Sequence, residues 1–179
     1  MPDRLLLVGM MGAGKTTVGE RCAARLGWRY LDSDAQVMAE TGRTVPEIFA
    51  EDGEAAFRAE ESRVLAEAVT GPERVVVSVA GGAVLAEANR QLLRRSGTVV
   101  WLRADPAVLA ARVGAGEGRP LLGDDPGAAL AALDVVRRPL YGSVADAAVD
   151  VDALAPDDVV DRVLVAAGLA GSGRSGAMS

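Results

Sequence analysis

Short apolar runs and longer amphipathic segments alternate along this chain. The apolar runs have the length of strands, are rich in leucine and valine, and cover 5–8, 28–31, 74–79, 98–103 and 149–151. Runs this short, without polar alternation, are typical of strands that are buried on both faces. Strands that alternate with helices indicate an α/β domain.

Between these runs, apolar residues recur at helical spacing, so that Val18, Cys22 and Leu26, for example, share one stripe. Helices are predicted over 17–26, 35–40, 45–51, 54–69, 89–95, 106–113, 127–141 and 157–167. Pro139 is expected to end or kink its helix, because proline lacks the backbone N–H that a helix interior requires.

The length of 179 residues is that of one domain, which we place at 1–167. A chain of this size buries roughly 70% of its unfolded surface, enough for a complete core. The remaining residues, 168–179, are rich in glycine and serine. Such a composition predicts a disordered tail.

The segment 9–16, Gly-Met-Met-Gly-Ala-Gly-Lys-Thr, matches the phosphate-binding pattern G-x-x-x-x-G-K-[ST] at every fixed position. It lies between an apolar run and a predicted helix, which is the setting that the motif requires. Glycines let backbone N–H groups approach phosphate oxygens, and the helix N-terminus adds its positive dipole end. Lys15 supplies a mobile charge, and Thr16 places a hydroxyl where Mg²⁺ would bind. The alternative is a glycine-rich turn before an ordinary helix.

Lys15 is the single lysine of the chain, which otherwise uses 18 arginines as its cations. A guanidinium is a wide planar fork, whereas a bridge between β- and γ-phosphates needs a slim ammonium. The exception therefore favours a phosphate-binding role for Lys15.

Two acids, Asp32 and Asp34, directly follow the second predicted strand. Because α/β sheets place their ligands at the carboxyl ends of strands, we expect one acid to face the phosphate loop and the other to face an acceptor pocket. The alternative is that one of them only caps the next helix.

The net charge of −6 and a pI near 4.8 argue against a nucleic acid or an anionic membrane as the main partner. The absence of histidine excludes a Ser-His-Asp triad and a histidine-bound metal. Cys22 is the only cysteine, so we expect a packing residue and a reducing compartment.

The first apolar run is too short for a signal-peptide core, and no run is long enough to cross a membrane. We expect a soluble, cytoplasmic monomer that acts on a small molecule.

Two later segments offer candidate ligands. Ala80-Gly81-Gly82 ends the third predicted strand, where glycine lets backbone amides approach a ligand, although a tight turn explains the pair equally well. The loop 114–126 is long and rich in glycine and proline, which is typical of a lid. Its single cation, Arg119, suits the charge that develops in phosphoryl transfer. A surface loop without function is the alternative.

The predicted helix over 54–69 carries Phe57 and Glu61 on one face, with Arg58 beside them. The two phenylalanines of the chain, Phe49 and Phe57, form either core or one wall of an acceptor pocket. Arg58 is either a solvated surface charge or a clamp for a carboxylate.

With these residues laid out, the chain resembles the shikimate kinases, small P-loop kinases of aromatic amino-acid biosynthesis. The resemblance covers nearly all of 5–164 and rests on motifs at 9–17, 31–34, 48–49, 53–54, 57–58, 81–84, 119–122 and 137–141. It implies a three-layer, nucleoside-monophosphate-kinase-like sandwich with a lid and a five-stranded parallel sheet in the order 2-3-1-4-5. It also implies transfer of the ATP γ-phosphate to the 3-hydroxyl of shikimate.

The resemblance assigns roles to matching residues. Thr16 and Asp32 would hold Mg²⁺, Asp34 would hold the acceptor hydroxyl and take its proton, and Arg119 would reach the phosphates from a lid over about 114–126. Lys15, Asp34 and Arg119 would be the catalytic residues, with the acceptor bound over about 33–69. The residues implied to bind ATP are Gly12, Ala13, Gly14, Lys15, Thr16, Thr17, Arg112 and Pro156, and those implied to bind shikimate are Asp34, Arg58, Gly81, Gly82 and Arg137.

One residue departs from the family pattern, because Ala80 stands where a glycine is usual. If this position needs a positive φ or a close backbone approach, alanine costs about 1 kcal/mol or more and reshapes the acceptor pocket. Two alternatives therefore stay open. One is a kinase for gluconate or another polyhydroxy acid, and the other is a nucleotide-binding module without transfer activity.

Overall fold

The structure is a computed structural model that describes residues 3–113 and 122–171. Within these residues, five parallel strands form one sheet in the order β2-β3-β1-β4-β5. The strands are β1 (Arg4–Val8), β2 (Arg29–Asp32), β3 (Val75–Ser78), β4 (Thr98–Arg103) and β5 (Ala147–Asp150). The order and the parallel pairing confirm the predicted sheet.

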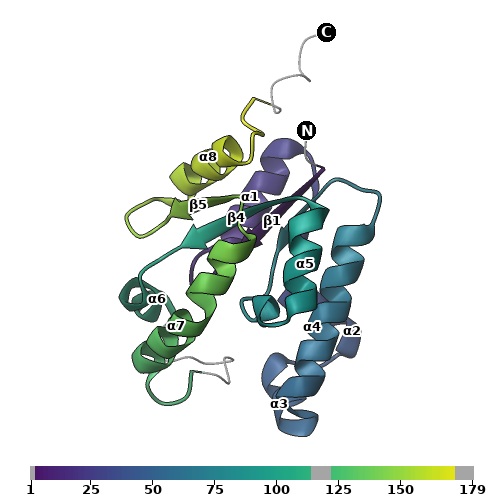
Figure 1. Cartoon of the computed structure of the whole chain (residues 1–179), viewed down its shortest axis with the longest axis vertical. Helices are drawn as coiled ribbons and strands as arrows, with labels where there is room; N and C mark the ends of the chain where they lie inside the picture. The colour runs from purple at the N-terminus through teal and green to yellow at the C-terminus, as the bar shows by residue number, and fades with distance from the viewer. Residues whose placement is uncertain (1–2, 114–121, 172–179) are drawn as a thin grey trace.

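Helices cover both faces of this sheet (Figure 1). They are α1 (Lys15–Leu26), α2 (Ser33–Thr41), α3 (Val45–Glu51), α4 (Gly53–Thr70), η1 (Ala83–Leu85), α5 (Glu87–Ser96), α6 (Pro106–Val113), α7 (Pro126–Val144) and α8 (Pro156–Ala166). Helices α1 and α8 pack together on one face, whereas α4, α5 and α7 lie on the other, and α2 and α3 pack against α4. The fold is therefore the predicted three-layer sandwich.

The centre of the core is β1, whose residues Leu5, Leu6 and Leu7 are completely buried. Cys22 of α1 packs into the same core, and burial raises the pKa of its thiol to about 12. A thiol in such surroundings stays protonated and unreactive. The prediction that Cys22 is a packing residue is confirmed.

A second, smaller apolar cluster joins α2, α3 and α4. It consists of Val37, Ile48, Phe57 and Val64, with Phe49 packed against it. The rings of Phe49 and Phe57 lie 5.0 Å apart, centre to centre. This cluster gives the 33–69 region a core of its own beside the sheet.

The register of the strands brings their carboxyl ends to one edge. Asp32, the last residue of β2, lies beside Ser78, the last residue of β3, and Ser78 lies beside Leu7 of β1. The phosphate loop starts two residues later, at Gly9. The loop and the acid are therefore neighbours because of strand pairing, although they are far apart in sequence.

Two predictions of element ends differ from the structure. Helix α7 continues past Pro139 to Val144, because Tyr141 and Val144 are buried, and their packing outweighs one lost backbone hydrogen bond. The chain also stays packed after residue 167, since Leu169 is 1% exposed and its N–H donates to the Leu164 carbonyl at 2.8 Å. The predicted disorder therefore does not hold for 168 and 169, and 172–179 lie outside the described residues.

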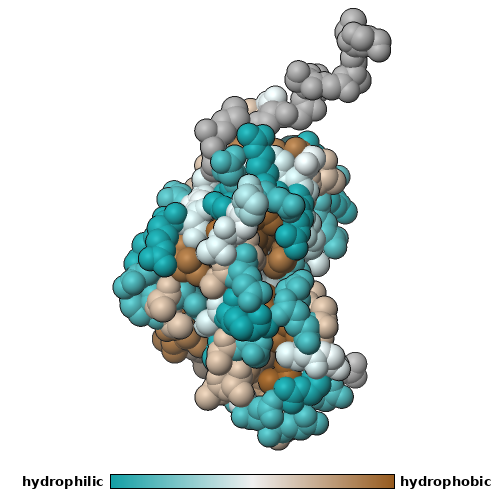
Figure 2. All heavy atoms as spheres, turned by 90° about the vertical axis from the view of Figure 1, so that its right-hand side faces the viewer, coloured by the Kyte–Doolittle hydropathy of each residue, from teal (hydrophilic) through white to brown (hydrophobic). Residues whose placement is uncertain are grey.

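The surface seen in Figure 2, the right-hand side of Figure 1, is mostly hydrophilic, with small hydrophobic areas between the polar groups. Arg63 of α4 forms ion pairs with Glu40 of α2 and with Glu60 and Glu67 of its own helix. Among the described residues, no helix is both long and apolar enough to span a bilayer.

Candidate functional site

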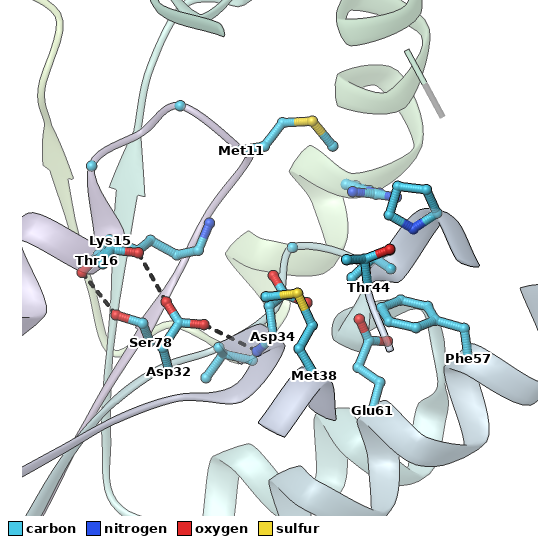
Figure 3. A pocket seen from close by; sticks show the side chains of 18 of the residues that line it. Met11, Lys15, Thr16, Asp32, Asp34, Met38, Thr44, Phe57, Glu61 and Ser78 are labelled. Atoms are coloured by element: carbon cyan, nitrogen blue, oxygen red, sulfur yellow. Dashed lines mark hydrogen bonds between the residues drawn. The ribbon is translucent and has the colours of Figure 1, made fainter. Parts of the chain in front are cut away.

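One cavity of about 750 Å³ brings most of the predicted site residues together. It is lined by Gly12, Gly14, Lys15, Thr16, Thr17, Asp32, Asp34, Arg58, Gly81, Gly82, Arg112 and Arg137, and also by Glu61 and Ser78. We call the part around Lys15, Thr16 and Asp32 the phosphate-loop end, and the part around Arg58 and Arg137 the arginine end. Figure 3 shows Asp34 between Asp32 on one side and Glu61 on the other.

Lys15 lies over the phosphate loop in this structure. Its Nζ donates to the carbonyls of Gly9 at 2.7 Å and Met10 at 3.0 Å. The cap of α1 is Gly14, which has no side chain to accept from the first helical N–H groups. A helix start of this kind, with an ammonium beside it, is suited to bind phosphate oxygens.

Asp32 uses its two carboxylate oxygens for different partners. Oδ1 accepts from the N–H groups of Asp34 at 3.0 Å and Ala35 at 3.1 Å, and so caps α2. Oδ2 accepts from the hydroxyl of Thr16 at 2.8 Å. Asp32 therefore caps α2 and also contacts the phosphate loop, so for this acid the alternative of a helix cap alone does not hold.

The Thr16 hydroxyl and the Asp32 carboxylate fit a magnesium ion. Mg²⁺ prefers oxygen ligands and is usually held by one or two carboxylates together with water and substrate phosphates. In the described part of the chain, no group of three or more His, Cys, Asp or Glu residues is arranged to hold a metal. An ion at this end would therefore take further ligands from a bound nucleotide or from water.

Arg58 forms part of the cavity wall, with its side chain 21% exposed. Its guanidinium carbon lies 5.3 Å from the centre of the Phe57 ring. A Cβ atom on Gly82 would lie 2.2 Å from Arg58 Nη1, so the guanidinium occupies space that only glycine leaves open. Arg58 is thus held inside the arginine end and is not a solvated surface charge. Phe57 is both core and cavity wall.

Glu61 is a cavity residue for which sequence reasoning predicted only an inward position. The residue is 2% exposed, and both of its carboxylate oxygens accept from Arg58 Nη1, at 2.9 and 3.0 Å. Burial raises the pKa of Glu61 to about 7, and the Arg58 charge partly offsets this effect. The available signal was an acid on the inward face of a helix, three residues after an arginine.

Arg137 is 2% exposed, and its Nε has no hydrogen-bond partner among the described residues. One helical turn later, the hydroxyl of Tyr141 donates to the carbonyl of Gly81 at 2.7 Å. A Cβ atom on Gly81 would lie 3.4 Å from Arg137 Nη1. Because α7 continues through Pro139, it presents Arg137 and Tyr141 to the same glycine turn.

Ala80 does not have the backbone conformation that would make alanine costly. No residue other than glycine has a positive φ in the described chain, and the left-handed glycines do not include Gly81 or Gly82. The Ala80 methyl group is buried in the core. The backbone N–H of Ala80 donates to Ser33 Oγ at 2.8 Å. The predicted cost depended on a positive φ or a close approach, and the first condition is not met.

Two predicted ligands, Ala13 and Pro156, are not part of the cavity lining. Ala13 is buried, and its N–H donates to the Met10 carbonyl at 3.2 Å. Pro156 begins α8 and is not part of the cavity lining. Arg119 and most of the predicted lid lie outside the described residues. Arg112 does line the cavity, where its guanidinium donates to the carbonyls of Val151 at 3.0 Å and Gly12 at 3.4 Å.

Comparison with known proteins shows which sequences this chain is similar to. A sequence model of the family "Shikimate kinase" matches residues 11–167. The shikimate kinase of Ruegeria pomeroyi is 49% identical over 164 residues, which cover 90% of this chain and 83% of the relative. That of Symbiobacterium thermophilum is 45% identical, covering 89% of this chain and 93% of the relative.

Solved structures agree with these relatives. A shikimate kinase from Acinetobacter baumannii in complex with shikimate has a TM-score of 0.88 and 38% identity, covering 92% of this chain and 91% of the other. A gluconokinase from Sinorhizobium meliloti has a TM-score of 0.57 and 24% identity, covering 92% and 91%. The second likeness shows a shared fold and nothing more.

Proposed function

This chain belongs to the shikimate kinase family, and on that premise we propose that it transfers the γ-phosphoryl group of ATP to the 3-hydroxyl of shikimate. The products are ADP and shikimate 3-phosphate. One observation carries the proposal: a single cavity has a phosphate loop at one end, two arginines at the other, and Asp34 between them. An acceptor with a carboxylate and a hydroxyl matches this order of groups.

At the phosphate-loop end, Lys15 exchanges its two loop carbonyls for the β- and γ-phosphates. Thr16 and Asp32 hold Mg²⁺, which neutralises charge on the phosphate oxygens when it is bound. The adenine lies near Arg112 and Pro156. The N–H groups at the start of α1 orient the phosphates, so the γ-phosphorus faces the arginine end.

At the arginine end, Arg58 and Arg137 bind the carboxylate of shikimate, together with the backbone amides of Gly81 and Gly82. Two guanidinium groups fix the orientation of a planar carboxylate as well as its position. The ring is thereby held with one hydroxyl in line with the γ-phosphorus. The oxygen of this hydroxyl forms the new bond to the γ-phosphorus while the bond between that phosphorus and ADP breaks. Asp34 accepts the proton that the hydroxyl loses.

The remaining roles follow the same premise. Arg119 is the candidate for stabilising charge on the transferred phosphoryl group, and it lies outside the described residues. We also propose that the protein is a monomer in the cytoplasm. This compartment supplies ATP for the phosphate loop and keeps the free Cys22 thiol reduced.

A coupled assay of ADP release tests the proposal. The purified chain with ATP and Mg²⁺ is compared in the presence of shikimate, of gluconate and of no acceptor. We expect release that depends on shikimate, with gluconate at the level of the blank. Release that ignores shikimate would overturn the proposal, and release driven by gluconate would favour the polyhydroxy-acid alternative.

A further inference from the structure

Tyr30 of β2 lies beside the phosphate-loop end without lining the cavity. It precedes Asp32 by two residues, so both side chains point to the same face of the sheet, the face covered by α1. The Tyr30 hydroxyl lies 3.0 Å from Ser78 Oγ, and Ser78 Oγ lies 2.7 Å from the Lys15 carbonyl oxygen. A chain of polar contacts thus connects β2, β3 and the first residue of α1.

The direction of these hydrogen bonds follows from the groups involved. A carbonyl oxygen can only accept, so the hydroxyl proton of Ser78 points to Lys15. Ser78 Oγ then accepts the proton of Tyr30. The Asp32 Oδ2 atom lies further from the Tyr30 hydroxyl, at 3.5 Å, and already accepts from Thr16 at 2.8 Å. Of these two acceptors, Ser78 is therefore the better partner for the phenol proton, and the Tyr30 hydroxyl also interacts with the Thr16 side chain.

The packing around this chain of bonds is close. A Cβ atom on Gly19 of α1 would lie 2.6 Å from Tyr30 Cε2 and 2.7 Å from Ser78 Oγ. Helix α1 therefore approaches Tyr30 and Ser78 at a point where any larger residue would force it away. The first turn of α1, just before Gly19, carries Thr16, whose hydroxyl must meet Asp32 of β2.

We infer that Tyr30 is a positioning residue for the Thr16–Asp32 pair, and that its hydroxyl acts through Ser78 on the Lys15 carbonyl and so on the first turn of α1. The inference rests on the proposed role of Thr16 and Asp32 in holding Mg²⁺. Magnesium demands nearly ideal ligand geometry, so a small shift of α1 against β2 weakens its binding. A phenylalanine would fill the same space but could not hold Ser78.

The test measures metal coupling and not turnover. ADP binding to the full-length chain is titrated calorimetrically with and without Mg²⁺, and the ratio of the two dissociation constants is the magnesium gain. Tyr30→Phe should reduce this gain about fivefold, the factor for one net hydrogen bond, and leave metal-free ADP binding unchanged. Ser78→Ala should have a similar effect, and the double variant should lose no more than Ser78→Ala alone.

Tyr141→Phe is the matched control, because Tyr30 and Tyr141 are the two tyrosines of the chain and Tyr141 bonds to Gly81 at the arginine end. It should leave the magnesium gain unchanged. A Tyr30→Phe chain with a lower melting temperature and an unchanged gain would make Tyr30 a packing residue and overturn the inference. Additive effects in the double variant would also overturn it. A wild-type chain without shikimate-dependent ADP release contradicts the proposed function but not the magnesium gain, so the two failures are distinguishable.

Discussion

Arg58 and Glu61 form an ion pair inside the cavity, in which Nη1 of the arginine donates to both oxygens of the carboxylate at 2.9 and 3.0 Å. Glu54 accepts from Nη2 of the same guanidinium at 3.3 Å but is largely exposed. Glu61 is therefore the buried partner that keeps Arg58 against Phe57 and Gly82. A guanidinium held in this way needs no reorganisation to receive a carboxylate.

Glu61→Gln should flatten the pH dependence of stability between about pH 4.5 and 7. The folded chain raises the pKa of Glu61 from 4.5 to about 7, so in this window it binds more protons than the unfolded chain. The contribution of Glu61 to the free energy of unfolding therefore falls as pH rises. Urea unfolding at several pH values measures the slope, with Glu54→Gln as the exposed control. An unchanged slope in Glu61→Gln would contradict the raised pKa.

Gly82→Ala should damage shikimate binding and spare ATP binding. The new Cβ atom would lie 2.2 Å from Arg58 Nη1, so the guanidinium must leave its place. We expect the KM for shikimate to rise roughly tenfold or more, the effect of losing one charged hydrogen bond, with little change in the KM for ATP. Gly71→Ala is the control, because a Cβ atom there meets nothing within 4 Å. Equal KM values in wild type and Gly82→Ala would argue against Arg58 as a substrate ligand.

Lys15→Ala should lower kcat by at least about 10²-fold, the usual cost of removing one electrostatic contact to a developing charge. Lys15→Arg should fail to restore it, because a guanidinium is too wide to bridge the β- and γ-phosphates. Steady-state kinetics give kcat, and circular dichroism checks that each variant is folded. Normal turnover in either variant would remove the phosphate-loop assignment.

Asp34→Asn should separate nucleotide binding from transfer. The amide keeps the size of the carboxylate but cannot take a proton, so kcat should fall about 10²- to 10⁴-fold. ADP affinity should stay near that of wild type, because the Asp34 backbone N–H still donates to Asp32 Oδ1. Calorimetry and single-turnover kinetics measure the two effects. A loss confined to nucleotide affinity would contradict the role of Asp34 at the acceptor.

Much of the fold and part of the site were predictable from the sequence because their signals are local. The strand and helix pattern, the phosphate loop and the acids at the end of β2 each depend on a few consecutive residues. The strand order came from a resemblance to a family, since no local pattern specifies it. Pro139 does not end its helix, which was one of the two outcomes predicted, because the packing of Tyr141 and Val144 outweighs the local preference of proline.

Two residues of the site were missed or were only placed in an element. One of them, Ser78, has a partner distant in sequence, and the other, Glu61, is a buried acid. In the sequence, Ser78 is one position in a valine-rich strand with no sign of a special role. Its partner Tyr30 lies 48 residues away. Glu61 reads as an acid on the wrong face of a helix until Arg58 is placed beside it. Spacing on the helix allows the Arg58–Glu61 pair but does not show that it is buried, and no spacing gives the Tyr30–Ser78 pair, which depends on strand pairing.

The divided carboxylate of Asp32 limits how far this position can change. One oxygen holds the start of α2 and the other holds Thr16, and the two cannot rotate independently. An asparagine could keep one of these bonds only by turning its N–H₂ group toward the other partner. Substitution of Asp32 is therefore restricted by two separate requirements, the cap of α2 in the acceptor region and the bond to Thr16 at the phosphate-loop end.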